Sequence, residues 1–303
     1  MIGQDTSTLV AEVRQGRPPL VEAAAPDLDL ALVEIHGGRG RADLEALREL
    51  WRFREVVGAF VKRQVLVKYK QAFVGIGWAV VQPIVGALLF ALFLGRFTHI
   101  GSEGVPYVVF VLAGTSSWSF FSGATSNSME SVVRDQTLLR KVYFPREILP
   151  LTAVLAALVD FAPALGTVVA ATLLTGIAPA LTWLALPLPL LLLTLTALGI
   201  GLAISGLNVY YRDVRYLLPF LIQLGLFSSP VIFSLDVVPE RWRLLYGAIN
   251  PAASAIDDMR RLLIHHTWPQ PGMNALALAW ALLLVAGGYW LFKRLERGFA
   301  DRV

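Results

Sequence analysis

Six long runs of apolar residues divide the sequence, and each is long enough to cross a lipid bilayer. They cover residues 75–97, 105–127, 148–176, 183–207, 217–235 and 273–292. A membrane-spanning helix needs roughly 20 predominantly apolar residues, because each residue advances the helix by about 1.5 Å. The pattern therefore predicts an all-α integral membrane protein of six transmembrane helices, with both termini on the same side.

The segments outside these runs have other patterns. Residues 1–42 mix charges with prolines and a glycine-rich stretch, which predicts a flexible arm. Over residues 43–72, apolar positions recur near the helical period and charged residues take the opposite face. This predicts an N-terminal amphipathic helix that lies in the cytoplasmic membrane interface. A six-span transmembrane domain then covers 73–303, with a cytoplasmic loop at 132–147 and an external segment at 236–270.

Composition and charge agree with a lipid environment and indicate its orientation. Hydrophobic residues make up 56% of the chain and charged residues 16%, whereas soluble domains carry about 25% charged residues. The net charge of +4 comes from clustered basic residues, which mark cytoplasmic segments rather than nucleic-acid binding. These residues are Lys62, Arg63, Lys68, Lys70, Arg134, Arg140, Lys141, Arg146, Arg212, Arg215, Lys293, Arg294, Arg297 and Arg302. Both termini are therefore predicted to be cytoplasmic, although the long loop after the fifth run is also basic.

The absence of certain motifs and residue types limits the classes of function that the chain can have. The sequence has no G-x-x-x-x-G-K-[ST] phosphate loop, so the chain is not expected to bind ATP in that manner. It has no cysteine, which excludes disulfides and thiolate metal sites. Asp160 is the only charge clearly inside a predicted span. It either couples a proton or has a structural role. In the structural role it would be protonated, or hydrogen-bonded to a group such as Ser205 or Asn208 on a neighbouring helix. Energy is therefore expected to arrive from another subunit.

The paired acids Asp257 and Asp258 are similar to those that bind magnesium in prenyl-diphosphate enzymes. Met259, Arg260 and Arg261 follow them and supply no third acid in step. A solvated helix start is therefore the favoured interpretation over a metal site. No catalytic residue and no metal site are predicted.

The loop after the second run combines basic and apolar residues. Apolar residues exposed on a cytoplasmic loop usually mark a docking surface. We expect this loop to contact a partner subunit; the alternative is that its apolar residues pack on the chain's own helices. The expected contact residues are Leu138, Leu139, Arg140, Lys141, Tyr143, Phe144 and Arg146.

The second run places Trp118, Phe120 and Phe121 among small and hydroxyl residues. Small residues suit close helix contact or a wet lumen, and aromatic faces suit the apolar faces of sugar rings. These three side chains are candidates for lining a glycan channel, with lipid-facing aromatics as the alternative.

The external segment contains two short amphipathic stretches separated by Asn250 and Pro251. Such a pair can dip into the membrane and return if its irregular backbone is buried in protein or lines a cavity. A hairpin lying on the surface is the alternative.

Several of these motifs together resemble the permease subunits of ABC-type polysaccharide exporters, those for O-antigen, capsule and teichoic acid. The resemblance runs from about residue 44 to the C-terminus, and Gln64 and Asp135 depart from the usual pattern. The matching residues are 50–54, 68–75, Trp78, Pro83, 138–150, Tyr211, Arg212, Asp213, Asn250, Pro251 and Arg260.

The resemblance implies a homodimer in the bacterial inner membrane, driven by a separate ATPase subunit that binds ATP and Mg, while this chain binds no cofactor. The implied cargo is a polysaccharide on an undecaprenyl-diphosphate carrier. The 138–146 loop becomes the coupling helix, and Asn250, Pro251 and Arg260 belong to the re-entrant segment. The entrance gate and lipid-headgroup residues become Trp51, Arg54, Arg63, Lys68, Tyr69 and Lys70. The alternatives are an ABC permease for a drug or a lipid, and a stand-alone channel or secondary carrier.

Overall fold

The computed structural model describes residues 51–70, 77–94, 106–139 and 144–299. The expected arm at 1–42 and three coupling-loop candidates, Arg140, Lys141 and Tyr143, lie outside these residues. All regular structure in the described part of the chain is helical, as the sequence predicts. The elements are α3 Arg54–Lys70, α4 Gly77–Leu94, α5 Tyr107–Arg134, α6 Gln136–Leu139, α7 Ile148–Leu174, η1 Leu181–Ala185, α8 Pro187–Tyr210, α9 Val214–Ser228, η2 Leu235–Val237, α10 Glu240–Ile249, α11 Pro251–Leu263 and α12 Pro271–Glu296.

Among the described residues, four helices are long and apolar enough to cross a membrane. They are α5, α7, α12 and the stretch Leu181–Tyr210 that contains α8. Helix α5 corresponds to the second predicted span, α7 to the third, Leu181–Tyr210 to the fourth and α12 to the sixth. Two further apolar helices are shorter, Val80–Phe93 within α4 and Val214–Ser228, which is α9. They correspond to the first and fifth predicted spans.

The fifth predicted span, 217–235, is wrong at its C-terminal end. Helix α9 stops at Ser228, and Ser229 is extended with φ −112° and ψ 152°. Pro230 is the physical reason, because a proline disfavours helical geometry in the residue before it. With 15 residues, α9 is about 22 Å long, shorter than the roughly 30 Å hydrocarbon core.

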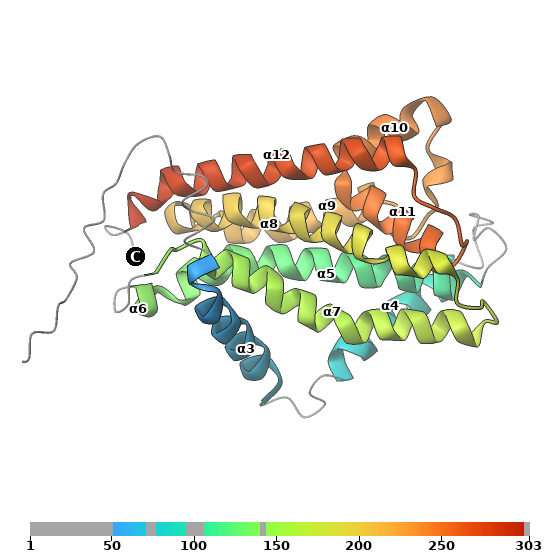
Figure 1. Cartoon of the computed structure of the whole chain (residues 1–303), viewed down its shortest axis with the longest axis horizontal. Helices are drawn as coiled ribbons and strands as arrows, with labels where there is room; N and C mark the ends of the chain where they lie inside the picture. The colour runs from blue at the N-terminus through green and yellow to red at the C-terminus, as the bar shows by residue number, and fades with distance from the viewer. Residues whose placement is uncertain (1–50, 71–76, 95–105, 140–143, 300–303) are drawn as a thin grey trace, which may run out of the picture. The chain divides into compact units, whose positions relative to one another are not determined.

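Helix α5 lies at the centre of the fold and packs against α4, α7, α8 and α11. Figure 1 shows α5, α7, α8 and α12 running along one another. Small side chains permit the close approach: a Cβ atom at Gly201 of α8 would overlap Ser128 of α5, and one at Gly199 would overlap the α12 backbone near Leu284. Small residues serve this purpose in membrane helices, where packing and not the hydrophobic effect drives association.

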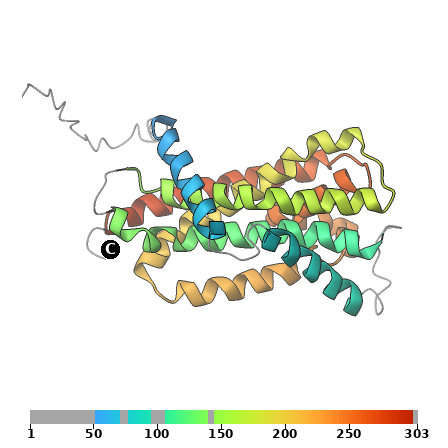
Figure 2. The ribbon, with the colours of Figure 1, turned by 90° about the horizontal axis from the view of Figure 1, so that it is seen from below.

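The outer helices carry the exposed apolar surface. Large hydrophobic side chains on α4, α9 and α12 are exposed, among them Leu92, Phe220 and Leu283. Figures 1 and 2 show α3 and α4 inclined to the long helices. An exposed apolar surface of this extent suits contact with lipid or with another membrane-spanning chain.

Candidate functional site

Asp160, in the middle of α7, accepts hydrogen bonds from two neighbouring residues of α3. Lys68 Nζ lies 2.6 Å from its Oδ2 and the Tyr69 hydroxyl 2.8 Å from its Oδ1. The expected partners on α8 are therefore wrong. Ser205 bonds within its own helix, to the Leu202 carbonyl, and the Asn208 amide donates to the Met129 carbonyl. Asp160 takes its counter-ion from α3 because that helix crosses α7 at this level.

The Tyr69 hydroxyl is held in its protonated state. Burial, and next the hydrogen bond to Asp160, raise the pKa of Tyr69 above its usual value. The phenol therefore remains a hydrogen-bond donor to the carboxylate at physiological pH.

A polar cleft of about 100 Å³ opens beside this ion pair, between α3, α4, α5 and α7. Its lining residues are Lys68, Gln82, Pro83, Ser116, Ser119, Phe120, Gly123, Asn127, Ala157, Asp160, Phe161 and Ala164. The sequence reasoning did not single out Gln82 or Asn127 for this site. A polar residue next to Pro83 inside an otherwise apolar run was the available signal for Gln82.

The remaining gate candidates lie elsewhere. Arg63 lies 3.5 Å from Asp135, at the C-terminal end of α5, and the Arg54 guanidinium lies 5.7 Å from the centre of the Trp51 ring. Trp51 is 71% exposed, and Lys70 is exposed at the end of α3. Of this set, therefore, only Lys68 lines the cleft, and Tyr69 reaches it through its hydrogen bond to Asp160.

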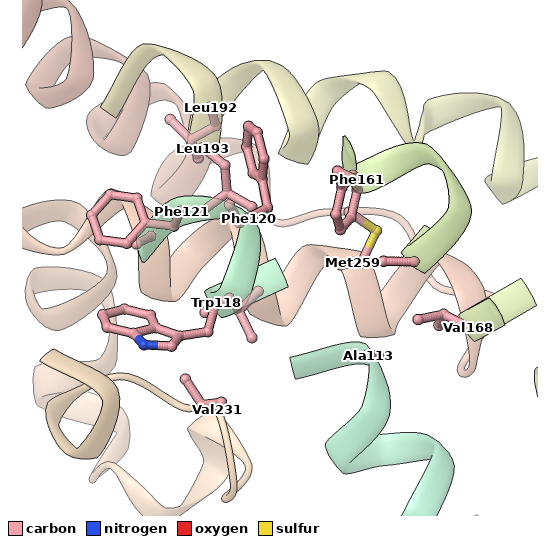
Figure 3. Packing of buried hydrophobic residues seen from close by; sticks show 14 of the residues in the cluster. Ala113, Trp118, Phe120, Phe121, Phe161, Val168, Leu192, Leu193, Val231 and Met259 are labelled. Carbon is pink, nitrogen blue, oxygen red and sulfur yellow. The ribbon is translucent and has the colours of Figure 1, made fainter. Parts of the chain in front are cut away.

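The channel candidates Trp118, Phe120 and Phe121 are buried in the chain's main apolar core. Their rings pack on one another and on a neighbouring helix, with 5.2 Å between the centres of Trp118 and Phe121 and 5.3 Å between Phe120 and Phe161. Figure 3 shows Phe120 and Phe121 near Leu193 of α8, and Trp118 near Val231. The lipid-facing alternative is therefore wrong. Phe120 also lines the polar cleft, whereas the glycan channel itself remains a prediction.

The coupling-loop candidates that the structure describes lie against the chain's own helices. Phe144 is 5% exposed, and its ring centre lies 5.5 Å from that of Phe60 in α3. Phe144 belongs to a second apolar cluster, formed by Val132, Phe144, Ile148, Leu149, Leu202, Phe292 and Phe299, and Leu138 and Leu139 are partly buried against it. The prediction of an exposed apolar anchor is therefore wrong for Phe144, because α3 covers it.

Arg146 joins the loop to the end of α12. Its Nη1 donates to the Glu296 carbonyl at 3.0 Å, and its guanidinium lies 5.7 Å from the centre of the Phe299 ring. The neighbouring Glu147 pairs with Lys293. The start of α7 and the end of α12 are thus bound to each other at several points.

In the segment 236–270, which the sequence predicts to be external, two helices meet at Asn250. Its side chain accepts a hydrogen bond from the Ala253 amide, and Pro251 occupies the first turn of α11. This is the usual arrangement at a helix start, where an asparagine caps the free amides and proline fits the first turn.

Arg260 is almost fully buried and holds the irregular stretch after α9 in place. Its guanidinium donates to the carbonyls of Phe110, Pro230, Val231 and Phe233 and lies 3.6 Å from the centre of the Phe110 ring. Gly114 permits this arrangement, since a Cβ atom there would overlap the guanidinium and the Val231 carbonyl. The sequence reasoning missed Gly114 and Phe110, which contact Arg260 only in the tertiary structure.

Asp257 and Asp258 do not form a solvated helix start; that interpretation is wrong. Both are buried in α11, at 7% and 2% exposure. Asp257 pairs with Arg261 at 2.6 Å. Burial, and next the neighbouring Asp257, raise the pKa of Asp258 to about 7. No cluster of three or more histidine or acidic residues that could hold a metal occurs in the described residues.

Comparison with known proteins places the chain in a family. Two proteins of Klebsiella pneumoniae named O-antigen export system permease protein RfbA are 26% and 24% identical over 251 residues, which cover 82% of this chain and 94% of each relative. A protein of the same name from Myxococcus xanthus is 25% identical over 264 residues, 86% of this chain and 100% of the relative. The model of the ABC-2 type transporter family matches residues 55–264. Because that match covers more than half of the sequence, the chain belongs to the ABC-2 type transporter family.

Proposed function

We propose that this chain is the transmembrane subunit of an ATP-driven exporter that moves a lipid-linked surface polysaccharide of the O-antigen type across the bacterial inner membrane. The observation that carries the proposal is the similarity to O-antigen export permeases over more than four fifths of the chain. A drug or lipid permease is less well supported, since those relatives are named for O-antigen export. A secondary carrier is disfavoured because the model that matches residues 55–264 is that of ABC-2 type transporters.

The proposed assembly is a homodimer of six-span subunits above two ATPase subunits. Helices α4 and α9 complete the six crossings, and their exposed apolar side chains support contact with lipid or with the second copy. Both termini are cytoplasmic, and α10 with α11 forms the external re-entrant pair. ATP and Mg bind the partner subunit, so this chain performs no catalysis.

Each part of the chain has a proposed task. Helix α3 forms the gate at the entrance for the lipid headgroup. Trp118, Phe120 and Phe121 contact the sugar rings that pass α5 when the subunits move. The loop 132–147 receives the movement of the ATPase. Its contact with the end of α12 through Arg146 supports this task, because a bound pair of elements moves together.

Gene deletion in the native host tests the proposal. We expect the surface polysaccharide to disappear and its lipid-linked form to accumulate inside the inner membrane, with plasmid-borne wild-type gene restoring export. As a control, a strain that lacks both this gene and the gene of its ATPase subunit receives a plasmid with this gene alone. This plasmid should not restore export. Normal surface polysaccharide in the deletion strain, or export without any ATPase, contradicts the proposal.

Reporter fusions test the orientation. A reporter after Val303 should be active only in the cytoplasm, and one inserted near Trp268 only outside. Cytoplasmic activity at Trp268 contradicts the six-span topology.

A further inference from the structure

The two ends of α3 are held by different kinds of contact. Near its start, Val57 and Phe60 pack on the second apolar cluster. Toward its end the contacts are polar: Gln64 Nε2 donates to Thr152 Oγ1 at 3.1 Å, and Lys68 and Tyr69 bind Asp160. No residue of α3 is fully buried. The C-terminal half of the helix can therefore leave α7 if another polar group replaces these partners.

The cleft beside Lys68 is lined by hydrogen-bond donors around one carboxylate. Besides the Lys68 ammonium, it presents the amides of Gln82 and Asn127 and the hydroxyls of Ser116 and Ser119. Asp160 is the only acidic residue in this lining. Such a donor set suits an oxyanion with several acceptor oxygens.

Ser116 provides a second, independent sign that the cleft receives a ligand. This residue is 1% exposed, and its Oγ has no hydrogen-bond partner among the described residues. A buried hydroxyl without a partner is costly, so such groups in native proteins commonly serve water or a ligand. Ser116 is one of the residues that line the cleft shared by Lys68 and Asp160.

We propose that Asp160 occupies the place that a phosphate group of the lipid-linked ligand takes on entry, so that Lys68 exchanges the carboxylate for the phosphate and the end of α3 is released from α7. The inference rests on the proposed function for the lipid. It assigns to Asp160 the role of an internal competitor that keeps the entrance closed until a ligand with greater negative charge arrives.

The charges and the exposure of the two side chains favour replacement of Asp160 by a phosphate as the partner of Lys68, rather than loss of the ion pair without a new partner. The Lys68 side chain is 57% exposed, and that of Asp160 is 15% exposed, so the flexible lysine is the partner that turns. A diphosphate attracts an ammonium more strongly than a single carboxylate does at the same distance. Gln82 and Asn127 line the same cleft and carry amide donors, which limits the cost of leaving that carboxylate without Lys68 and Tyr69 once the end of α3 has moved.

Binding measurements with opposite expected signs test the exchange. Purified permease in nanodiscs is titrated with undecaprenyl diphosphate, with undecaprenol and with inorganic diphosphate. Lys68→Gln should weaken undecaprenyl diphosphate binding about tenfold, since a charge-assisted hydrogen bond is lost. Asp160→Asn should strengthen it several-fold, because the competitor is neutral. Arg215→Gln and Asp213→Asn remove one exposed charge each and serve as matched controls.

A merely structural ion pair predicts another result. Both variants would then weaken binding, and that outcome, or an unchanged affinity in Asp160→Asn, overturns the proposal. Inorganic diphosphate that binds as tightly as the lipid overturns the assignment to a lipid headgroup. Undecaprenol should not bind at this site.

Cross-linking tests the movement with Lys68 and Asp160 intact. The chain has no cysteine, so Gln64→Cys with Thr152→Cys introduces the only pair, which a short bismethanethiosulfonate bridges. Undecaprenyl diphosphate should slow bridging at least several-fold, and the bridged protein should lose export until a reductant restores it. The single-cysteine variants are the controls. Bridging at an unchanged rate, or full export while bridged, overturns the proposal.

The two proposals fail in distinguishable ways. If the binding signs are as expected but the deletion strain exports polysaccharide normally, the polysaccharide function is wrong and the exchange stands. If deletion abolishes export while the signs or the cross-linking disagree, the exchange alone is wrong.

Discussion

The carboxylate of Glu147, just before α7, lies 2.7 Å from the ammonium of Lys293 near the end of α12. The Glu147 residue is only 4% exposed, and Lys293 also lies 3.0 Å from Glu296 in the next turn. The loop proposed to receive force from the ATPase is therefore bound through this pair to the C-terminal end of α12.

Replacement of Lys293 by methionine should lower the stability of the permease on the order of 2 kcal/mol, because Glu147 would be left buried without its counter-ion. Thermal unfolding of the purified protein in detergent measures the effect. The double variant with Glu147→Gln should recover part of the loss. Equal stability of wild type and the single variant would show that the pair contributes nothing.

Gly114→Ala should destabilise the protein by roughly 2 kcal/mol or more, since the added methyl group displaces the Arg260 guanidinium from its buried carbonyl partners. Gly123→Ala, on the same helix, is the matched control, because a Cβ atom there meets nothing within 4 Å. It should be neutral or stabilising by up to about 1 kcal/mol. Similar unfolding temperatures for the two variants would disprove the assigned role of Gly114.

Tyr143→Ala should yield an inserted permease that no longer co-purifies with its ATPase or supports export. Loss of an interface anchor costs about 2 kcal/mol or more of binding. Phe144→Ala is the matched control, because Phe144 is buried against Phe60 and offers no exposed ring to a partner. A partner retained by the loop variant, or lost equally in the control, would refute docking through this loop.

Alanine at Trp118, Phe120 or Phe121 should cost roughly 3–5 kcal/mol of stability, because all three side chains are buried. Leucine variants separate transport from folding. Phe120→Leu should reduce export at normal expression, whereas Phe292→Leu, buried in the second cluster, should not. Full export by leucine variants at all three positions would place these rings in the core alone.

The stability of the protein should depend on pH through Asp258 of α11. An acid whose pKa is higher in the folded protein binds its proton more tightly there, so stability falls as the pH rises from about 4 to about 7. A pKa difference of that size corresponds to roughly 4 kcal/mol at most. The neighbouring Asp257 adds to this effect, whereas Asn274 and Arg261 oppose it.

Asp258→Asn should flatten this dependence and raise stability at pH 8, measured by thermal unfolding between pH 5 and pH 8. The exposed Asp213→Asn variant should retain the wild-type slope. An Asp258→Asn profile that is as steep as the wild-type profile would exclude Asp258 as its source.

Much of the fold was predictable from local pattern. The boundaries of α7 and α12 lie within a few residues of the predicted apolar runs, and the break between α10 and α11 falls at Asn250 as the turn chemistry indicates. Pro230 in the sequence also indicates the early end of α9. The predicted span continued beyond it because that span was based on hydropathy alone. Separated motifs in the right order were sufficient to identify the family.

The candidate site was predicted only in part. The family resemblance identified Lys68 and Tyr69 as gate residues, but their partner Asp160 lies 92 and 91 residues away in the sequence. Asp257 and Asp258 look solvated in the sequence because they are charged, and they are buried because α11 packs against α5, α8 and α12.

The sequence by itself determined the helices, the lipid environment and the family, because apolar runs, turn residues and motifs are local properties of the chain. Only the tertiary structure decided which apolar residues face the core and which charges meet. Lipid tails and a protein core are about equally apolar, so hydropathy cannot distinguish buried Trp118 and Phe144 from side chains exposed on α4 or α9. The pairing of Lys68 with Asp160 depends on how α3 crosses α7, and no local pattern encodes that crossing.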